Sequence, residues 1–154
     1  MARKQTNKTP KKYIPKSLSQ KDKKTIKKEL AKSRKQYKKD KYHKRKTVKS
    51  FKSKPSSHVV TAKKLYGLSS IKPSKKLSKK TGCTVKTLKN IMSRGMGAYY
   101  SSGSRPNQTA QSWGIARLAS SVTGGNASKS DFDLIEKGCS KDKPAYKKAK
   151  GKSN

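Results

Sequence analysis

The chain has 154 residues, which predicts a single domain, but only 29% of them are apolar, so the core must be small. Lys and Arg number 43 against 7 acidic residues, and the net charge of +36 drives the chain towards polyanions, of which nucleic acid is the commonest. No apolar run approaches the roughly 18 residues of a spanning helix. We therefore expect neither a membrane span nor a signal peptide.

The distribution of charge predicts three parts. Residues 1–57 hold 23 basic and 3 acidic side chains, residues 58–138 hold 14 and 3, and residues 139–154 hold 6 and 1. We expect a mainly α protein, in which a basic arm (1–57), extended or disordered, precedes a compact helical domain (58–138) and a basic tail (139–154).

Within the arm, Ser19 is a good N-cap for a helix from Gln20 to about Lys39. Its apolar residues Ile26, Leu30 and Tyr37 are too few for a core-facing stripe. Because like charges four residues apart repel, this helix should be marginal until phosphates or an acidic protein surface neutralise it. Residues 41–55 alternate basic with apolar or hydroxyl side chains, which suits either an extended segment along a partner or a disordered linker.

The compact part begins with a short helix over residues 59–66 that Gly67 ends. Residues 75–95 then fit a helix-turn-helix hairpin, with Gly82 in the turn, Thr84 as the second N-cap and Gly95 as the stop. Its outward side chains, together with part of the arm, are candidates for binding nucleic acid: Lys86, Thr87, Lys89, Asn90, Arg94, Lys44, Arg45 and Lys46. A plain αα-hairpin used for packing is the alternative.

Residues 95–114 form a neutral segment that carries one charge, Arg105. Its glycines predict a Gly/Tyr-rich turn or hairpin, followed by a helix over about 110–122 that Asn107 or Thr109 caps. Six residues are candidates for contact with an anion or a partner protein: Tyr99, Tyr100, Ser102, Arg105, Asn107 and Trp113. Alternatively, Tyr99, Tyr100 and Trp113 are scaffolding that completes a small core.

Three stretches of the chain match a known kind of protein: YIPKSLS from Tyr13, VKSFKSK from Val48, and GAYYSSGSRPNQTAQSWGIARLASSVTGG from Gly97. Over roughly residues 13–138 the chain resembles a family of small basic proteins of large DNA viruses of algae and protists, relatives of mimivirus and chlorella virus. That family is a domain of unknown function, so the resemblance implies a viral context and no catalytic residues.

The inventory of reactive groups is thin. Cys83 and Cys139 lack CxxC spacing, and we expect two unpaired thiols, with no zinc site and no disulfide. Residues 131–136, a short strand or one helical turn, hold acids that suit Mg²⁺ but more simply balance nearby lysines. We see no nucleophile with a base and no phosphate-binding loop, and therefore expect no enzyme, cofactor or metal.

These observations favour a non-enzymatic virion or virus-factory protein that binds viral double-stranded DNA through the arm and the hairpin. It would act in the virion and at the site of assembly in the host cytoplasm or nucleus. The alternative is a minor capsid or scaffold protein whose arm threads between shell proteins on the inner capsid surface. A sequence-specific regulator is a third possibility.

Overall fold

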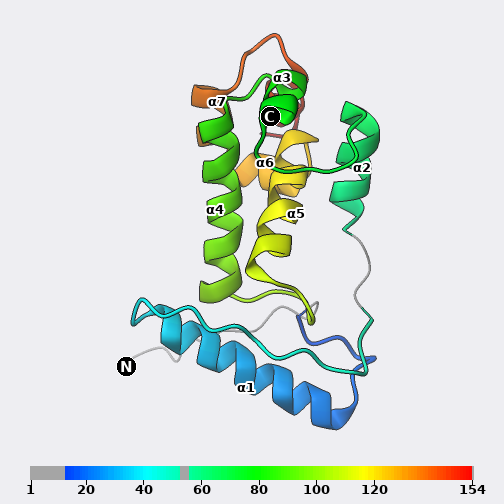
Figure 1. Ribbon diagram of the computed structural model, residues 1–154, viewed down its shortest axis with the longest axis vertical. Coiled ribbons are helices and arrows are strands. Elements are labelled where there is room, and N and C mark those ends of the chain that lie inside the picture. The colour runs from blue at the N-terminus through cyan, green and yellow to red at the C-terminus, as the bar shows by residue number, and fades with distance from the viewer. Residues whose placement is uncertain (1–12, 53–55, 154) are drawn as a thin grey trace. The chain divides into compact units, whose positions relative to one another are not determined.

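The computed structural model describes residues 13–52 and 56–153, and in these ranges the chain is mainly helical, as expected, with no strand (Figure 1). The helices are α1 (Gln20–Tyr37), α2 (Ser57–Tyr66), α3 (Lys75–Thr81), α4 (Val85–Ser101), α5 (Ala110–Val122), α6 (Asn126–Ser130), α7 (Phe132–Gly138) and α8 (Pro144–Ser153). None of these helices is both long and apolar enough to cross a membrane.

The described residues divide into two compact units. The first comprises residues 13–52 and 100–108, and therefore contains α1 and the loop that follows α4. The second comprises residues 56–99 and 109–153, with the remaining helices. The predicted arm is thus a folded unit in its described part, completed by a short segment from much later in the chain.

In the first unit, α1 begins where the sequence predicts. The Ser19 hydroxyl accepts a hydrogen bond from the Asp22 amide at 3.1 Å, which satisfies one of the free N–H groups of the first turn. Ile26 and Leu30 are only 4% and 2% exposed. The expectation that they are too few to form a buried stripe is wrong, because residues 45–46 and 104–108 line the space beside them.

The second unit is built around one apolar core, to which six helices and the segments between them contribute. Its buried members are Ala62, Tyr66, Ile71, Leu77, Cys83, Leu88, Ile91, Leu118, Ala119, Val122, Ile135, Cys139, Ala145, Tyr146 and Ala149. The Tyr66 hydroxyl donates to the Val122 carbonyl, and burial raises the pKa of Tyr66 to about 12. The predicted helices over 59–66 and 110–122 are confirmed as α2 and α5, the latter capped by Thr109.

Of the two glycines predicted to end helices in the hairpin, one does so and the other does not. Gly82 is left-handed, with φ +83°, and ends α3 as expected. Gly95, however, is not a stop, because α4 continues to Ser101. A methyl group on Gly95 would lie 2.8 Å from the Gly114 Cα of α5, so these glycines let two helices pack backbone to backbone. The predicted Gly/Tyr-rich turn is therefore wrong up to residue 101.

The C-terminal end is also more ordered than predicted. Residues 144–153 form α8, in which Ala145 and Ala149 are fully buried and the Tyr146 ring lies 5.9 Å from that of Phe132. The small alanines let a lysine-rich helix approach the core while its charges stay outside. The prediction of a basic tail from residue 139 is wrong on this point, since the second unit includes α8.

Cys83 and Cys139 form a disulfide, which corrects the expectation of two unpaired thiols. The two residues face each other in an antiparallel bridge. The Thr84 amide donates to the Gly138 carbonyl at 2.9 Å, and the Ser140 amide to the Gly82 carbonyl at 2.8 Å. These bonds fasten the α3–α4 connection to the α7–α8 connection, 56 residues apart in sequence.

A buried carboxylate ties α4, α5 and α7 together. Asp131 is fully buried, and its oxygens accept hydrogen bonds from Arg117 at 2.7 and 3.0 Å and from Ser121 at 2.7 Å. Arg94 reaches Asp131 at 3.3 Å and makes two bonds to the exposed Asp133, whose pKa falls to about 2 chiefly through the hydrogen bond from Arg94. Residues 132–136 are thus helical, Asp131 immediately precedes the helix, and Asp131 and Asp133 bind arginines.

The disulfide should stabilise the second unit, because it closes a long loop in the unfolded chain. We expect Cys83→Ser combined with Cys139→Ser to lower the free energy of unfolding by about 2–4 kcal/mol, measured by urea unfolding with far-UV circular dichroism. The wild-type chain in reductant should behave like the double variant. Midpoints unchanged by either treatment would contradict the bond.

Arg94, Arg117, Asp131 and Asp133 form a cluster that we call the arginine cluster. Its two aspartates allow a buried and an exposed ion pair to be compared. Asp131→Asn leaves Arg117 without its buried counter-charge, and we expect a loss of about 3–5 kcal/mol in the free energy of unfolding. Asp133→Asn removes an exposed ion pair, worth about 0–1 kcal/mol. Equal losses in thermal or urea unfolding would show that Asp131 is not the anchor of the cluster.

Candidate nucleic-acid interface

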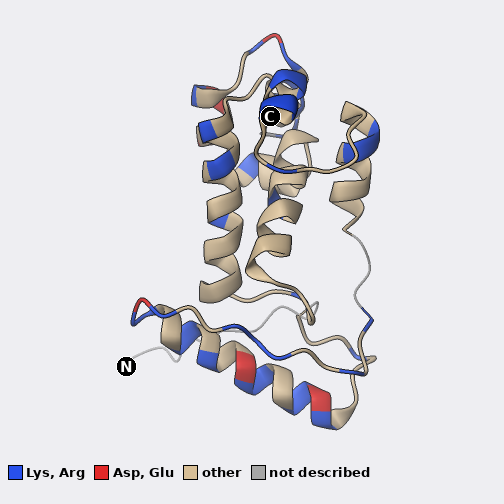
Figure 2. Cartoon of the chain, viewed as in Figure 1, with Lys and Arg blue, Asp and Glu red and all other residues tan. Residues whose placement is uncertain are grey.

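One face of α1 carries a row of lysines. The exposed members are Lys21, Lys24, Lys27, Lys28, Lys32 and Lys35. At 100° per residue they fall within an arc of about 140°, and we call them the α1 lysine face. Figure 2 shows basic residues along α1 and along the segment that follows it. The lysine face is a regular array of charge on α1, the helix that lies wholly within the described part of the first unit.

The acids of α1 lie away from this face. The Asp22 carboxylate accepts hydrogen bonds from the Ser50 amide, at 3.0 Å, and from the Ser50 hydroxyl. These bonds, the side-chain one foremost, lower the pKa of Asp22. Glu29 is buried and pairs with His43. Both acids therefore bind residues 43–50 of the same unit, and the lysine face keeps its charge.

The loop over residues 102–108 binds the basic arm through neutral acceptors. Arg34 of α1 donates from Nε and Nη2 to the Ser102 carbonyl, at 3.2 and 3.0 Å. Arg45 donates to the Ser104 hydroxyl at 2.5 Å and to the Ser33 hydroxyl at 3.1 Å. Ser33 in turn donates to the Tyr100 carbonyl at 3.0 Å. Two guanidinium groups are thus held in place without being neutralised by a carboxylate in these contacts.

Asn107 fixes the end of the arm segment. Its Oδ1 accepts from the Val48 amide at 2.7 Å, and its Nδ2 donates to the carbonyls of Val48 and Phe51, at 3.0 and 2.7 Å. Asn107 has φ +60°, a left-handed conformation that Asn tolerates better than most residues. The Asn107 side chain thus forms hydrogen bonds with the backbone of Val48 and Phe51, much as a neighbouring strand would. The Val48 side chain is buried.

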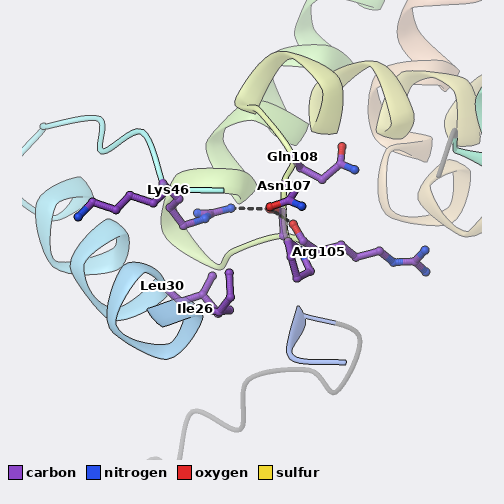
Figure 3. A pocket seen from close by; sticks show the side chains of 9 residues that line it. Ile26, Leu30, Lys46, Arg105, Asn107 and Gln108 are labelled. Carbon is purple, nitrogen blue, oxygen red and sulfur yellow. Dashed lines mark hydrogen bonds between the residues drawn. The ribbon is translucent and has the colours of Figure 1, made fainter. Parts of the chain in front are cut away.

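A small pocket lies where these segments meet (Figure 3). Its lining comes from α1, the arm segment and the loop: Ile26, Leu30, Arg45, Lys46, Ser104, Arg105, Pro106, Asn107 and Gln108. In Figure 3 the side chains of Lys46 and Arg105 extend in opposite directions, away from the apolar residues Ile26 and Leu30. The floor of the pocket is therefore apolar and the two charges lie outside it.

The predicted contact residues of the neutral segment do not form one site. Ser102 and Asn107 bind the chain's own arm, which fills the role we assigned to an anion or a partner. Tyr99 is 1% exposed in the second unit, and Trp113 is half-buried there on α5. Arg105 is exposed, and the Tyr100 ring stacks on that of Tyr37, with centroids 6.4 Å apart.

The predicted nucleic-acid residues also separate into two groups. Lys86, Lys89 and Asn90 are exposed on α4, and Lys44 and Lys46 are exposed in the arm. Three of the predicted side chains have partners within the chain: Arg45 binds Ser33 and Ser104, Arg94 binds Asp131 and Asp133, and Thr87 is 7% exposed and bonded to Thr84. Thr87 is buried, so its placement on an outward reading face is wrong, whereas Arg94 is exposed but bound to Asp131 and Asp133.

Sequence reasoning missed the α1 lysine face as a site. The signal was present in the spacing, because lysines recur at intervals of three and four residues between Lys21 and Lys35. It was overlooked because the same pattern, without an ordered partner for the opposite face, indicates only a self-repelling helix.

Asn107 should decide whether the arm stays bound to the loop. Asn107→Gly keeps the left-handed backbone accessible but removes three hydrogen bonds, so we expect faster hydrogen exchange at the Val48 amide, equivalent to about 1–3 kcal/mol. Ser102→Ala is the control, because Arg34 binds the carbonyl of Ser102 rather than its side chain. Equal exchange rates in the two variants would show that the Asn107 side chain does not hold the Val48 backbone.

Comparison with known proteins adds a family but no activity. The profile of a family described as a family of unknown function, DUF5824, matches residues 10–137. No curated protein and no solved structure matches the chain. Since the match covers most of the sequence, from the arm through the arginine cluster, the chain belongs to the DUF5824 family.

Proposed function

We propose that this protein is a non-enzymatic nucleic-acid-binding protein whose α1 lysine face contacts phosphates. The observation that carries the proposal is the segregation of charge on α1, where six exposed lysines share one face while Asp22 and Glu29 bind Ser50 and His43 in the segment after the helix. The resemblance to proteins of large DNA viruses supplies the context. In that context the ligand is viral double-stranded DNA, in the virion or at the site of assembly.

The dimensions of the face suit a phosphate backbone. Lys21 and Lys35 are separated by 14 residues, which at 1.5 Å per residue is about 21 Å of helix. Duplex DNA carries about one negative charge per 1.7 Å of its axis, both strands counted, so this length of duplex carries about twelve phosphates, of which those on the near side can meet the lysines. Binding of this kind releases counterions and carries no sequence information.

The α3–α4 hairpin supports a lesser contribution to binding. Gly82 gives the two helices a tight left-handed connection, and Lys86 and Lys89 are exposed at the start of α4. Thr87 and Arg94 are occupied within the second unit, which removes two of the five side chains that a base-reading helix would use. We assign phosphate contact to the hairpin, as a helix-turn-helix-like element, and no base readout.

The rival function, a minor capsid or scaffold protein, depends on a neutral surface that docks on a neighbour. In the described residues the loop over 102–108 is engaged by Arg34, Arg45 and the backbone of Val48. This contact leaves the rival with less support than DNA binding. Fractionation of disrupted virions after nuclease treatment separates the two: release together with the genome favours DNA binding, and retention on shell fragments favours the capsid role.

The α1 lysine face should determine the salt dependence of DNA affinity. Replacing Lys24, Lys28 and Lys35 by Gln should reduce the slope of log affinity against log salt by about 2.7, or about 0.9 per phosphate contact, in anisotropy titrations with a random duplex. The matched control replaces Lys147, Lys148 and Lys150, which are exposed on α8 and change the net charge equally. An equal loss of slope in both variants would refute the assignment to α1.

A further inference from the structure

Three tyrosines form a cluster at the end of α1. Tyr37 and Tyr100 stack with an interplanar angle of 9°, and Tyr42 packs against both, with ring centroids 6.2 Å from Tyr37 and 5.0 Å from Tyr100. All three belong to the first unit. The tilts of 55° and 50° are typical of favourable aromatic pairs, so the Tyr42 ring is held in one orientation.

A reverse turn brings Tyr42 back over the helix. The Asp40 amide donates to the Tyr37 carbonyl at 3.0 Å, and the Lys41 amide donates to the Gln36 carbonyl at 2.9 Å. Asp40 has φ +57°, a left-handed conformation that few residues besides Gly, Asn and Asp adopt. The chain therefore adopts an unfavourable backbone conformation at Asp40, and the resulting turn brings Tyr42 against the other two rings.

Despite these contacts, Tyr42 is 68% exposed, and it is one of three large hydrophobic side chains exposed in the described residues. The others, Val60 and Leu65, are aliphatic. Lysines surround Tyr42 in sequence, and those at positions 38, 39, 41 and 44 are all exposed. An exposed aromatic ring with four exposed lysines and one exposed acid, Asp40, within four residues in sequence offers the two components of a site for an unpaired nucleotide: a stacking surface and nearby cations for its phosphate.

We propose that Tyr42 is a stacking platform for an unpaired base, so that the first unit binds single-stranded nucleic acid as well as duplex. The proposal rests on the proposed nucleic-acid function and names a second class of ligand for it. In a duplex the faces of the bases are covered by their neighbours, whereas an unpaired base offers a free face to an aromatic ring. The lysines serve both ligands, and Tyr42 serves the single strand alone.

Three Tyr42 variants separate stacking from apolar contact. We expect Tyr42→Ala to weaken binding of a fluorescent oligothymidylate by about 5- to 150-fold, the effect of losing one base–aromatic stack. Tyr42→Leu should lose as much, because leucine is apolar but has no ring, and Tyr42→Phe should bind like the wild type. Affinity for a duplex of the same length should be unchanged in all three.

Leu65→Ala is the matched control, because Leu65 is an exposed apolar side chain beside Lys63 and Lys64 that lacks an aromatic ring. It should leave binding of both oligonucleotides unchanged, and circular dichroism verifies that every variant is folded. Oligothymidylate affinity that is unaffected by Tyr42→Ala, or restored by Tyr42→Leu, overturns the platform while duplex binding through α1 stands. A wild-type chain that binds neither strand nor duplex overturns both proposals.

Discussion

The structure of the first unit depends on neutral acceptors that hold cationic side chains. Arg34 and Arg45 are bound by the Ser102 carbonyl and by the hydroxyls of Ser33 and Ser104, and Asn107 binds the arm backbone. Residues 13–52 contain 17 Lys and Arg and 3 acids, so carboxylates alone cannot neutralise this segment. Hydrogen bonds to charged donors contribute more than neutral ones, roughly 1.5–3 kcal/mol each, and they order the arm without consuming its charge.

The arginines of the two units bind different kinds of acceptor. In the second unit, Arg94 and Arg117 bind Asp131 and Asp133, so their charges are cancelled and their role is to join helices. In the first unit, Arg34 and Arg45 donate to the Ser102 carbonyl and to the hydroxyls of Ser33 and Ser104. These hydrogen bonds order the arm through neutral acceptors, and the loop over 102–108 contains no acid.

Local signals in the sequence were sufficient for several helices. Ser19, Gly67 and Thr109 mark real helix ends, because caps act on neighbouring N–H and C=O groups and need no tertiary information. Gly95 was misread, because the same residue that ends an isolated helix also permits close approach of another, and only the partner Gly114 distinguishes the two. The Cys83–Cys139 bond was likewise invisible, since 56 residues separate the two thiols.

The sequence predicts the chemistry of a candidate site more readily than the arrangement of its residues. Composition alone indicates a polyanion as the partner, whereas the spacing on α4 does not reveal that Thr87 is buried and bonded to Thr84, or that Arg94 binds acids 37 and 39 residues later. The α1 lysine face requires that the opposite face be covered, and the covering segment, residues 102–108, is more than 60 residues away in sequence.

One face of α1 is covered by residues 102–108 and the other carries the lysines, and this arrangement has a thermodynamic consequence. The lysines of the α1 face repel one another and weaken the helix that carries them, while residues 43–50 and the loop over 102–108 stabilise the same helix from its other side. A polyanion that neutralises the outer face removes the repulsion and leaves the inner contacts intact. Binding and folding of the first unit are then linked, because a ligand that binds the ordered helix more tightly than the unfolded arm also stabilises the ordered form. Under the proposed function, the loop over 102–108 would hold the lysines in place before a polyanion binds, which would lower the entropic cost of binding.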